Sequence, residues 1–174
     1  MNYHNITKDD MLNGDGIRIV LWVSGCSMHC KGCQNPQTWD RESGIKFDSE
    51  ALNELLDALN HDYIQGLTIS GGHPLEDYNL SEVENICKTV KKLYPKKDIW
   101  IYTGYNFSDI IYDQKYDEIL SYVDVIVDGK YDEKLRDLSL PYRGSSNQKI
   151  WRRRLGFPLI WIDEESENSV AYMP

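Results

Sequence analysis

The sequence has few cysteines and prolines, and it contains no long run of hydrophobic residues. Its 174 residues include four Cys, six Pro and three Phe. The best apolar stretch, Ile17 to Val23, is interrupted by Arg18 and has the length of one strand, so no membrane span is predicted. Because no basic stretch followed by an apolar region opens the chain, we expect no signal peptide and a cytoplasmic location. There the cysteines are predicted to be thiols, metal ligands or catalytic groups rather than disulfides.

Basic residues are also scarce relative to acidic ones. Nineteen Lys and Arg stand against 28 Asp and Glu, which gives a formal net charge of −9. A general nucleic-acid binder needs a basic face, so no nucleic-acid partner is expected. The 41% of hydrophobic and 27% of charged residues are ordinary for a globular protein, and the length favours a single domain.

Strand-like and helix-like segments alternate along the chain. The predicted strands are Gly16–Val23, Leu67–Ser70, Asp98–Thr103 and Val123–Val127. The predicted helices start at Asp48 or Ser49, at a capping box over Ser81–Glu84, and at Ser108. The second of them should carry its apolar face on Val83, Ile86, Cys87, Val90 and Leu93, and end before Pro95. We predict a domain over residues 1–155 and a C-terminal tail over 156–174 that frays from Asp163.

This alternation predicts right-handed βαβ units and a parallel sheet. About four units cannot close an eight-stranded barrel, so the expected α/β fold is an open, partial TIM-like barrel. Gly71-Gly72, Gly104, Gly129 and a cysteine-rich loop over Ser24–Gly44 all follow predicted strand ends. Such ends share one edge of a parallel sheet, so we expect the functional site there.

Three cysteines stand close together in the loop after the first strand. Cys26, Cys30 and Cys33 have the spacing Cys-x₃-Cys-x₂-Cys, and thiolates suit iron–sulfur clusters, zinc or Cu(I). A structural zinc site usually has four ligands, so three cysteines favour a four-iron cluster with one open iron. A zinc knuckle or a redox thiol cluster stays as the alternative. The fourth cysteine, Cys87, lies on an apolar helix face and is predicted to be a buried core thiol.

The cysteine spacing together with Gly71-Gly72 resembles the radical S-adenosylmethionine (SAM) superfamily. More narrowly, the chain is similar to the activating proteins of anaerobic ribonucleoside-triphosphate reductases. The similarity runs in order from Met1 to about Trp151. It is carried by Asn13–Gly16, Val23–Cys26, Gly32–Asn35, Thr38–Trp39, Leu67–Leu75, Asp98–Trp100, Thr103–Tyr105, Val123–Val125, Asp128–Lys130 and Arg143–Gln148.

The resemblance implies a radical SAM oxidoreductase that activates a glycyl-radical enzyme. Cys26, Cys30 and Cys33 would hold one [4Fe–4S] cluster, whose open iron binds SAM. Reductive cleavage then gives methionine and a 5′-deoxyadenosyl radical, which takes a hydrogen atom from a glycine of the reductase. The implied partners are that reductase as protein substrate and flavodoxin or ferredoxin as electron donor. The implied assembly is a homodimer, or a heterotetramer with the reductase.

The resemblance also implies the SAM contacts. Gly71 and Gly72 would let the backbone approach the methionine moiety, and Gly32, Cys33 and Gln34 would pass the adenine. His73 stands where many superfamily members have an acidic residue that receives the ammonium group of SAM. A neutral imidazole accepts a hydrogen bond but carries no opposite charge, so binding is expected to weaken at acid pH.

Other functions are compatible with parts of the sequence. The chain could activate a different glycyl-radical enzyme, carry electrons or clusters without catalysis, or be a zinc-binding interaction module. A carrier usually ligates every iron, and a zinc module would bind colourless metal and lose its fold on chelation. The roles of Arg143–Gln148 and of the basic run Arg152–Arg154 stay open, between a partner or anion contact and a solvated polar segment.

Overall fold

The computed structural model describes residues 1–154 and 160–172, with backbone alone for 166–172. No helix within these residues is both long and apolar enough to cross a membrane. The strands are β1 (Asn2–Asp10), β2 (Ile17–Val23), β3 (Ile45–Lys46), β4 (Ile64–Gly71), β5 (Asp98–Tyr102), β6 (Val125–Asp128), β7 (Lys149–Arg154), β8 (Ile160–Asp163) and β9 (Ser166–Tyr172). The helices are α1 (Ser49–Leu59), α2 (Asp77–Leu93), α3 (Phe107–Ile111) and α4 (Asp117–Tyr122), with 3₁₀ turns η1 (Pro36–Thr38), η2 (Gln114–Tyr116) and η3 (Glu133–Leu135).

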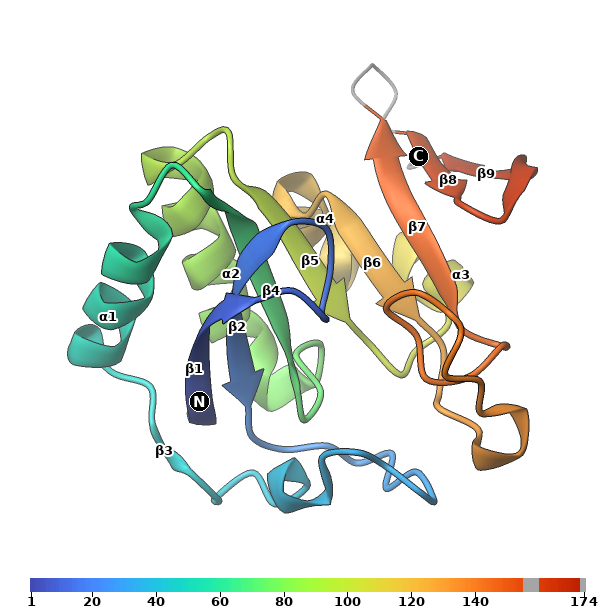
Figure 1. Ribbon diagram of the computed structural model, residues 1–174, viewed down its shortest axis with the longest axis horizontal. Helices are drawn as coiled ribbons and strands as arrows, with labels where there is room; N and C mark the ends of the chain where they lie inside the picture. The colour runs from blue at the N-terminus through green and yellow to red at the C-terminus, as the bar shows by residue number, and fades with distance from the viewer. Residues whose placement is uncertain (155–159, 173–174) are drawn as a thin grey trace.

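The nine strands form one mixed sheet in the order β3-β1-β2-β4-β5-β6-β7-β8-β9 (Figure 1). Its centre, β2-β4-β5-β6, is parallel and corresponds to the four predicted strands. Both flanks are antiparallel, so the prediction of a purely parallel sheet is wrong outside this centre. β3 and β9 stand at opposite ends of the order, so the sheet is open.

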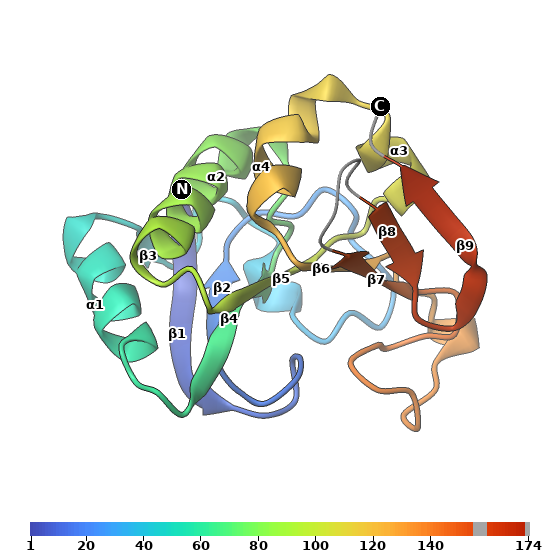
Figure 2. The same cartoon turned by 90° about the horizontal axis from the view of Figure 1, so that it is seen from above.

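The helices cover one face of the sheet (Figure 2). Alternate residues of the central strands, such as Ile19, Leu21 and Val23 of β2, point into the main hydrophobic core beneath the helices. The opposite face carries a smaller cluster of Trp100, Val125, Val127 and Ile150. Loops rather than helices flank this second face (Figure 2). This second face therefore has no helix over it, although its central side chains are buried.

Two helix predictions need correction. α2 begins at Asp77 after Glu76, so the predicted capping box at Ser81 lies inside the helix, and Leu93 is 52% exposed rather than part of the core. The early start lets buried Asn79 reach the carbonyls of Ser24 and His73. The predicted third helix consists of α3 and α4, which are separated by η2. Asp113 caps η2 by accepting a hydrogen bond from the Lys115 amide at 3.0 Å.

The C-terminal region contributes strands that the sequence pattern did not indicate. β8 and β9 lie within the predicted tail and continue the sheet from β7, so the predicted fraying is wrong up to Tyr172. Met173 and Pro174 lie outside the described residues. The basic run in β7 is not simply solvated, because Arg152 pairs with Asp15 at 2.8 Å and Arg153 with Asp124 at 2.8 Å.

Candidate functional site

The cysteine loop leaves the carboxyl end of β2 and folds back on itself. The Gly25 amide donates to the Thr38 carbonyl at 2.7 Å, and the Cys26 amide donates to the Trp39 carbonyl at 3.0 Å. Gly25 has a φ of +92°, a conformation that glycine adopts without strain. These contacts hold the segment from Cys26 to Cys33 as a projecting turn at the edge of the sheet.

The three predicted ligands are partly exposed thiols on this turn. The Asn35 amide donates to the Cys33 sulfur at 3.3 Å. Burial raises the pKa of Cys26 and Cys30, whereas backbone amides of Met28 and His29 act on the Cys26 sulfur in the opposite sense. The ammonium group of Lys130 offsets part of the rise at Cys30, and the pKa values of both thiols stay above their ordinary value. Amide donors and a cation near sulfur stabilise the thiolate form that iron requires.

The three sulfurs do not form a ready-made site for a single ion. Within the described part of the chain, no three His, Cys, Asp or Glu side chains are grouped so that they could hold one metal ion. A closed structural zinc site needs four convergent ligands, whereas a cluster distributes its cysteines over separate irons. Three partly exposed thiols, with amide donors beside Cys26 and Cys33, are a donor set that suits an iron–sulfur cluster.

The glycine pair after β4 lies against the start of the cysteine loop. Val23 and Gly71 are neighbours in the β2-β4 pairing, so both loops leave the sheet at the same level. The Gly72 amide donates to the Val23 carbonyl at 2.8 Å, and the His73 amide donates to the Gly25 carbonyl at 2.7 Å. A side chain at position 72 would overlap the Gly25 backbone. Gly71, with a φ of +100°, completes the turn. The pair thus gives the cysteine loop a close backbone neighbour.

His73 lies in the interior, with 1% of its surface exposed. Its Nε2 accepts from the Gly104 amide at 3.3 Å and lies 2.7 Å from the Thr103 hydroxyl, while its Nδ1 faces Glu76 Oε1 at 3.4 Å. Burial lowers its pKa, and the Glu76 carboxylate opposes that effect only in part. The imidazole is thus neutral and occupied by contacts within the protein. Its role toward SAM stays a prediction.

Two residues that the sequence analysis did not single out connect α2 to the cysteine loop. The Glu76 carboxylate accepts hydrogen bonds from the Ser27 amide at 3.0 Å and the Ser27 hydroxyl at 2.5 Å. Burial raises the pKa of Glu76, but these hydrogen bonds and His73 outweigh burial and bring it below its ordinary value. The residues are 49 positions apart, so no local sequence signal could have paired them.

The remaining strand ends also reach the cysteine loop, as the sequence predicts. A side chain at Gly104, after β5, would contact Met28. Beyond β6, Glu133 lies beside Gly32 and forms an ion pair with Lys31 at 2.9 Å. Gly32 and Gln34, the predicted adenine contacts, are exposed on the outer part of the loop. Loops after β2, β4, β5 and β6 therefore meet at one edge of the sheet.

The segment Arg143–Gln148 stabilises the loop after β6. The Gln148 amide oxygen accepts from the backbone of Gly144 at 2.9 Å, and its nitrogen donates to the Gly129 carbonyl at 3.0 Å. Asn147 donates to the Lys130 carbonyl at 2.8 Å, and buried Arg143 pairs with Glu165 at 2.6 Å. This segment thus holds the part of the loop that adjoins Cys30.

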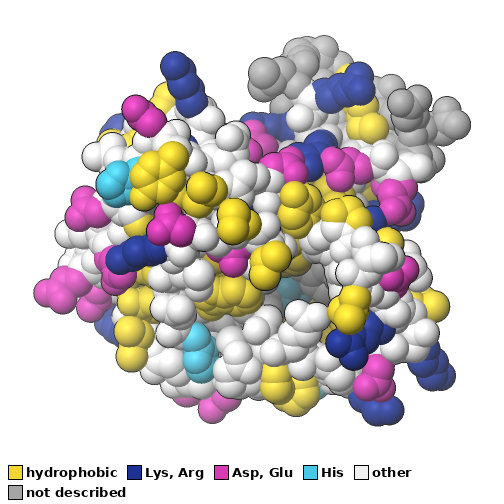
Figure 3. Space-filling view, viewed as in Figure 1, with side chains coloured by type: hydrophobic (Ala, Val, Ile, Leu, Met, Phe, Trp, Pro, Cys, Tyr) yellow, Lys and Arg dark blue, Asp and Glu magenta, His cyan; other side chains and the backbone are white. Residues whose placement is uncertain are grey.

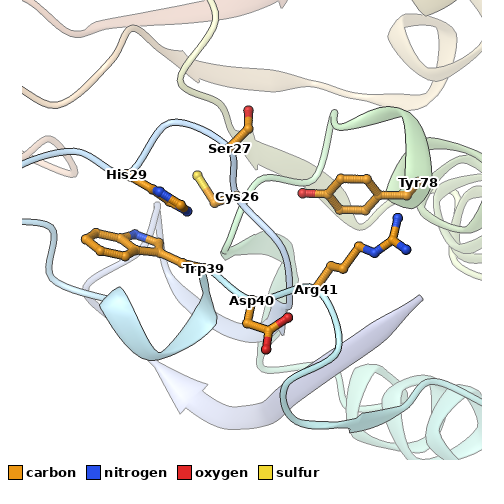
Figure 4. A pocket seen from close by; sticks show the side chains of 7 residues that line it. All are labelled: Cys26, Ser27, His29, Trp39, Asp40, Arg41 and Tyr78. Carbon is orange, nitrogen blue, oxygen red and sulfur yellow. The ribbon is translucent and has the colours of Figure 1, made fainter.

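A cavity of about 460 Å³ opens beside Cys26. Its walls include the rings of His29 and Trp39, tilted by 30° with centres 4.7 Å apart, and the Arg41 guanidinium 5.8 Å from the Tyr78 ring centre (Figure 4). On the sheet face that no helix covers, hydrophobic side chains gather around a hollow near the middle (Figure 3). The cavity therefore lets a small molecule reach Cys26.

Comparison with known proteins assigns the chain to a family. Residues 12–151 match the family described as a 4Fe-4S single cluster domain. A relative from Enterobacteria phage T4, named anaerobic ribonucleoside-triphosphate reductase-activating protein, is 47% identical over 161 residues, which cover 92% of this chain and 98% of the relative. The chain belongs to the 4Fe-4S single cluster domain family and to the anaerobic ribonucleoside-triphosphate reductase-activating proteins.

Bacterial members of the activating-protein family also align over most of the chain. The Pasteurella multocida protein of that name is 41% identical over 154 residues, which cover 87% of this chain and 98% of the relative. The Escherichia coli K12 protein is 38% identical over 156 residues, covering 88% of this chain and 100% of the relative. The resemblance to the activating proteins is thus confirmed, as is a 4Fe-4S domain that includes the cysteine loop.

Proposed function

We propose that this protein activates an anaerobic ribonucleoside-triphosphate reductase by generating a glycyl radical on it. The observation that carries the proposal is the cysteine loop, in which Cys26, Cys30 and Cys33 are partly exposed thiols inside a 4Fe-4S domain. Relatives named for this activation align over nearly their whole length. The proposal places the protein in the cytoplasm and treats its open sheet as the partial barrel of a radical SAM enzyme.

The three thiolates would hold a [4Fe–4S] cluster with one open iron. When bound, the cluster supplies the electron that cleaves SAM to methionine and a 5′-deoxyadenosyl radical, which takes a hydrogen atom from a glycine of the reductase. The protein supplies orientation and exclusion of water. Gly71 and Gly72 would offer backbone groups to the methionine moiety, and Gly32, Cys33 and Gln34 would pass the adenine.

The proposal includes two protein partners. The reductase glycine must approach the cysteine loop, and the sheet face without helices offers that approach. Flavodoxin or ferredoxin would supply the electron. Assembly as a homodimer, or as a heterotetramer with the reductase, belongs to the same proposal.

The test is formation of a glycyl radical on the cognate reductase. The anaerobically reconstituted protein is mixed with the reductase, SAM and a reductant, and the radical is quantified by electron paramagnetic resonance (EPR). Cys30→Ala should abolish the signal, whereas Cys87→Ala removes the same group from the core and should retain it. A radical that forms equally well with Cys30→Ala, or no radical with the wild type, would refute the proposal.

A further inference from the structure

Glu76 is a nearly buried carboxylate beside the cysteine loop that the proposed SAM contacts do not use. It is 9% exposed and lies where the chain enters α2. One of its oxygens, Oε1, accepts from the Ser27 amide at 3.0 Å and the Ser27 hydroxyl at 2.5 Å, and it faces His73 Nδ1 at 3.4 Å. Two hydrogen bonds to one oxygen favour the ionised carboxylate.

Hydrogen bonds from the start of α2 reach the backbone on both sides of Cys26. Ser27 follows Cys26 directly, so the amide that Glu76 accepts from is attached to the Cys26 carbonyl carbon. On the other side, the Asn79 side chain donates to the Ser24 carbonyl at 2.9 Å. The backbone amide of Asn79 donates to the Glu76 carbonyl at 2.8 Å, which fixes the position of Asn79. The first cluster ligand is therefore fixed between two contacts to the first turn of one helix.

The same arrangement keeps a negative charge near Cys26. Among the described residues, no Lys or Arg forms an ion pair with Glu76, and the basic side chain beside it is His73, whose Nδ1 lies 3.4 Å from Oε1. That histidine is buried, and its Nε2 accepts the Gly104 amide, so it is neutral. A charge with little exposure to water acts more strongly on its neighbours than one in bulk solvent. Reduction potentials of iron–sulfur clusters respond to nearby charge and to the geometry of their ligands.

We propose that Glu76 is a positioning residue for the cysteine loop and that its carboxylate lowers the reduction potential of the cluster. The anchoring acts through Ser27, which holds the backbone next to Cys26. The electrostatic effect follows because a reduced cluster carries one more negative charge, which a neighbouring carboxylate disfavours. This inference rests on the proposed [4Fe–4S] cluster at Cys26, Cys30 and Cys33.

Three variants separate the effect of the Glu76 charge from the effect of its hydrogen bonds to Ser27. Glu76→Gln removes the charge and keeps an oxygen that can accept from Ser27. Ser27→Ala keeps the charge and removes the hydroxyl donor. Asp77→Asn is the matched control, because it removes the same charge from the next residue, whose side chain is 82% exposed and pairs with Lys115. Exposed charges are screened by water and salt, so this control should not affect the cluster.

The readout is the reduced fraction of the cluster, measured by EPR at fixed solution potentials. Glu76→Gln should raise the ratio of reduced to oxidised cluster about threefold, which is a positive shift of about 28 mV at 59 mV per tenfold change. Ser27→Ala should leave this ratio unchanged but release iron to a chelator about threefold faster. Asp77→Asn should match the wild type in both measurements.

Each alternative result has a definite meaning. A reduced fraction that is the same in Glu76→Gln and the wild type overturns the electrostatic effect while the cluster itself stands. Iron release from Ser27→Ala at the wild-type rate overturns the anchoring. If the reconstituted wild type holds no iron–sulfur cluster, both this inference and the proposed function fail. The EPR titration and the chelator assay need neither SAM nor the reductase, so a failure of activation alone leaves their results intact.

Discussion

Gly72→Ala should destabilise the protein by placing one methyl group between two loops of the site. A Cβ at this position would overlap the Gly25 carbonyl oxygen and lie 3.0 Å from its carbon and nitrogen. The Gly72 backbone has no positive φ, so the substitution is penalised by the contact rather than by conformational strain. Because the obstacle is backbone, it cannot move aside as the end of a flexible side chain can.

The size of the effect follows from overpacking and from two hydrogen bonds. Forcing a methyl group into a packed site costs about 1–3 kcal/mol. Separating the loops also weakens the bonds from Gly72 to Val23 and from His73 to Gly25, each worth about 1 kcal/mol. We therefore expect a loss of about 3 kcal/mol in the free energy of unfolding. For a domain of this size that corresponds to a fall in Tm of about 6–12 °C.

Gly104→Ala is the matched control for this prediction. Its added Cβ would meet the Met28 side chain at 3.1 Å, and a thioether chain can rotate away. Denaturant unfolding of both metal-free variants should show a loss of about 3 kcal/mol for Gly72→Ala and less than about 1 kcal/mol for Gly104→Ala. Equal stabilities of the two variants would refute the packing argument.

Two further predictions concern titratable groups. Burial raises the pKa of the Cys87 thiol, and its side chain is 0% exposed. In the metal-free native protein, iodoacetamide should therefore modify Cys26, Cys30 and Cys33 and reach Cys87 only after denaturation. Detection of modified Cys87 by mass spectrometry of the native protein would contradict this prediction. Burial lowers the pKa of His73 below 6.5, so just below that pH the unfolded chain binds more protons than the folded one. The free energy of unfolding should therefore fall as the pH falls from 6.5, with a slope of up to about 1.4 kcal/mol per pH unit from this group. His73→Gln should remove this part of the pH dependence. If urea unfolding at several pH values gave the same change in unfolding free energy per pH unit for the variant and the wild type, the prediction would be disproved.

The part of the fold predicted from sequence is the part with the strongest local pattern. The four central strands are apolar on both faces, and glycine or a cysteine loop follows each of them. β1 was missed because it is a polar strand near the sheet edge, in which Tyr3 and Ile6 are the only hydrophobic residues. β7 was missed because three of its six residues are arginines, and the carboxylates that pair with Arg152 and Arg153 are distant in sequence.

Some features of the candidate site could likewise be predicted from local sequence, and others could not. The cysteines and the glycine pair are recognisable because the spacing of the ligands and the absence of a Cβ are local properties. The contact between Glu76 and Ser27 and the burial of His73 against Thr103 depend on how β4, β5 and α2 come together. A capping pattern at Ser81 was misleading because α2 begins one turn earlier, at Asp77, and its first turn contacts the cysteine loop through Asn79.

The most direct test of the account is reductive cleavage of SAM by this chain alone. The protein is reconstituted anaerobically with iron and sulfide, reduced with dithionite and incubated with SAM, and 5′-deoxyadenosine is measured by chromatography. We predict cleavage that requires the reductant, disappears in Cys30→Ala and persists in Cys87→Ala. A colourless zinc protein that never forms 5′-deoxyadenosine would contradict the account and favour a metal-binding interaction module.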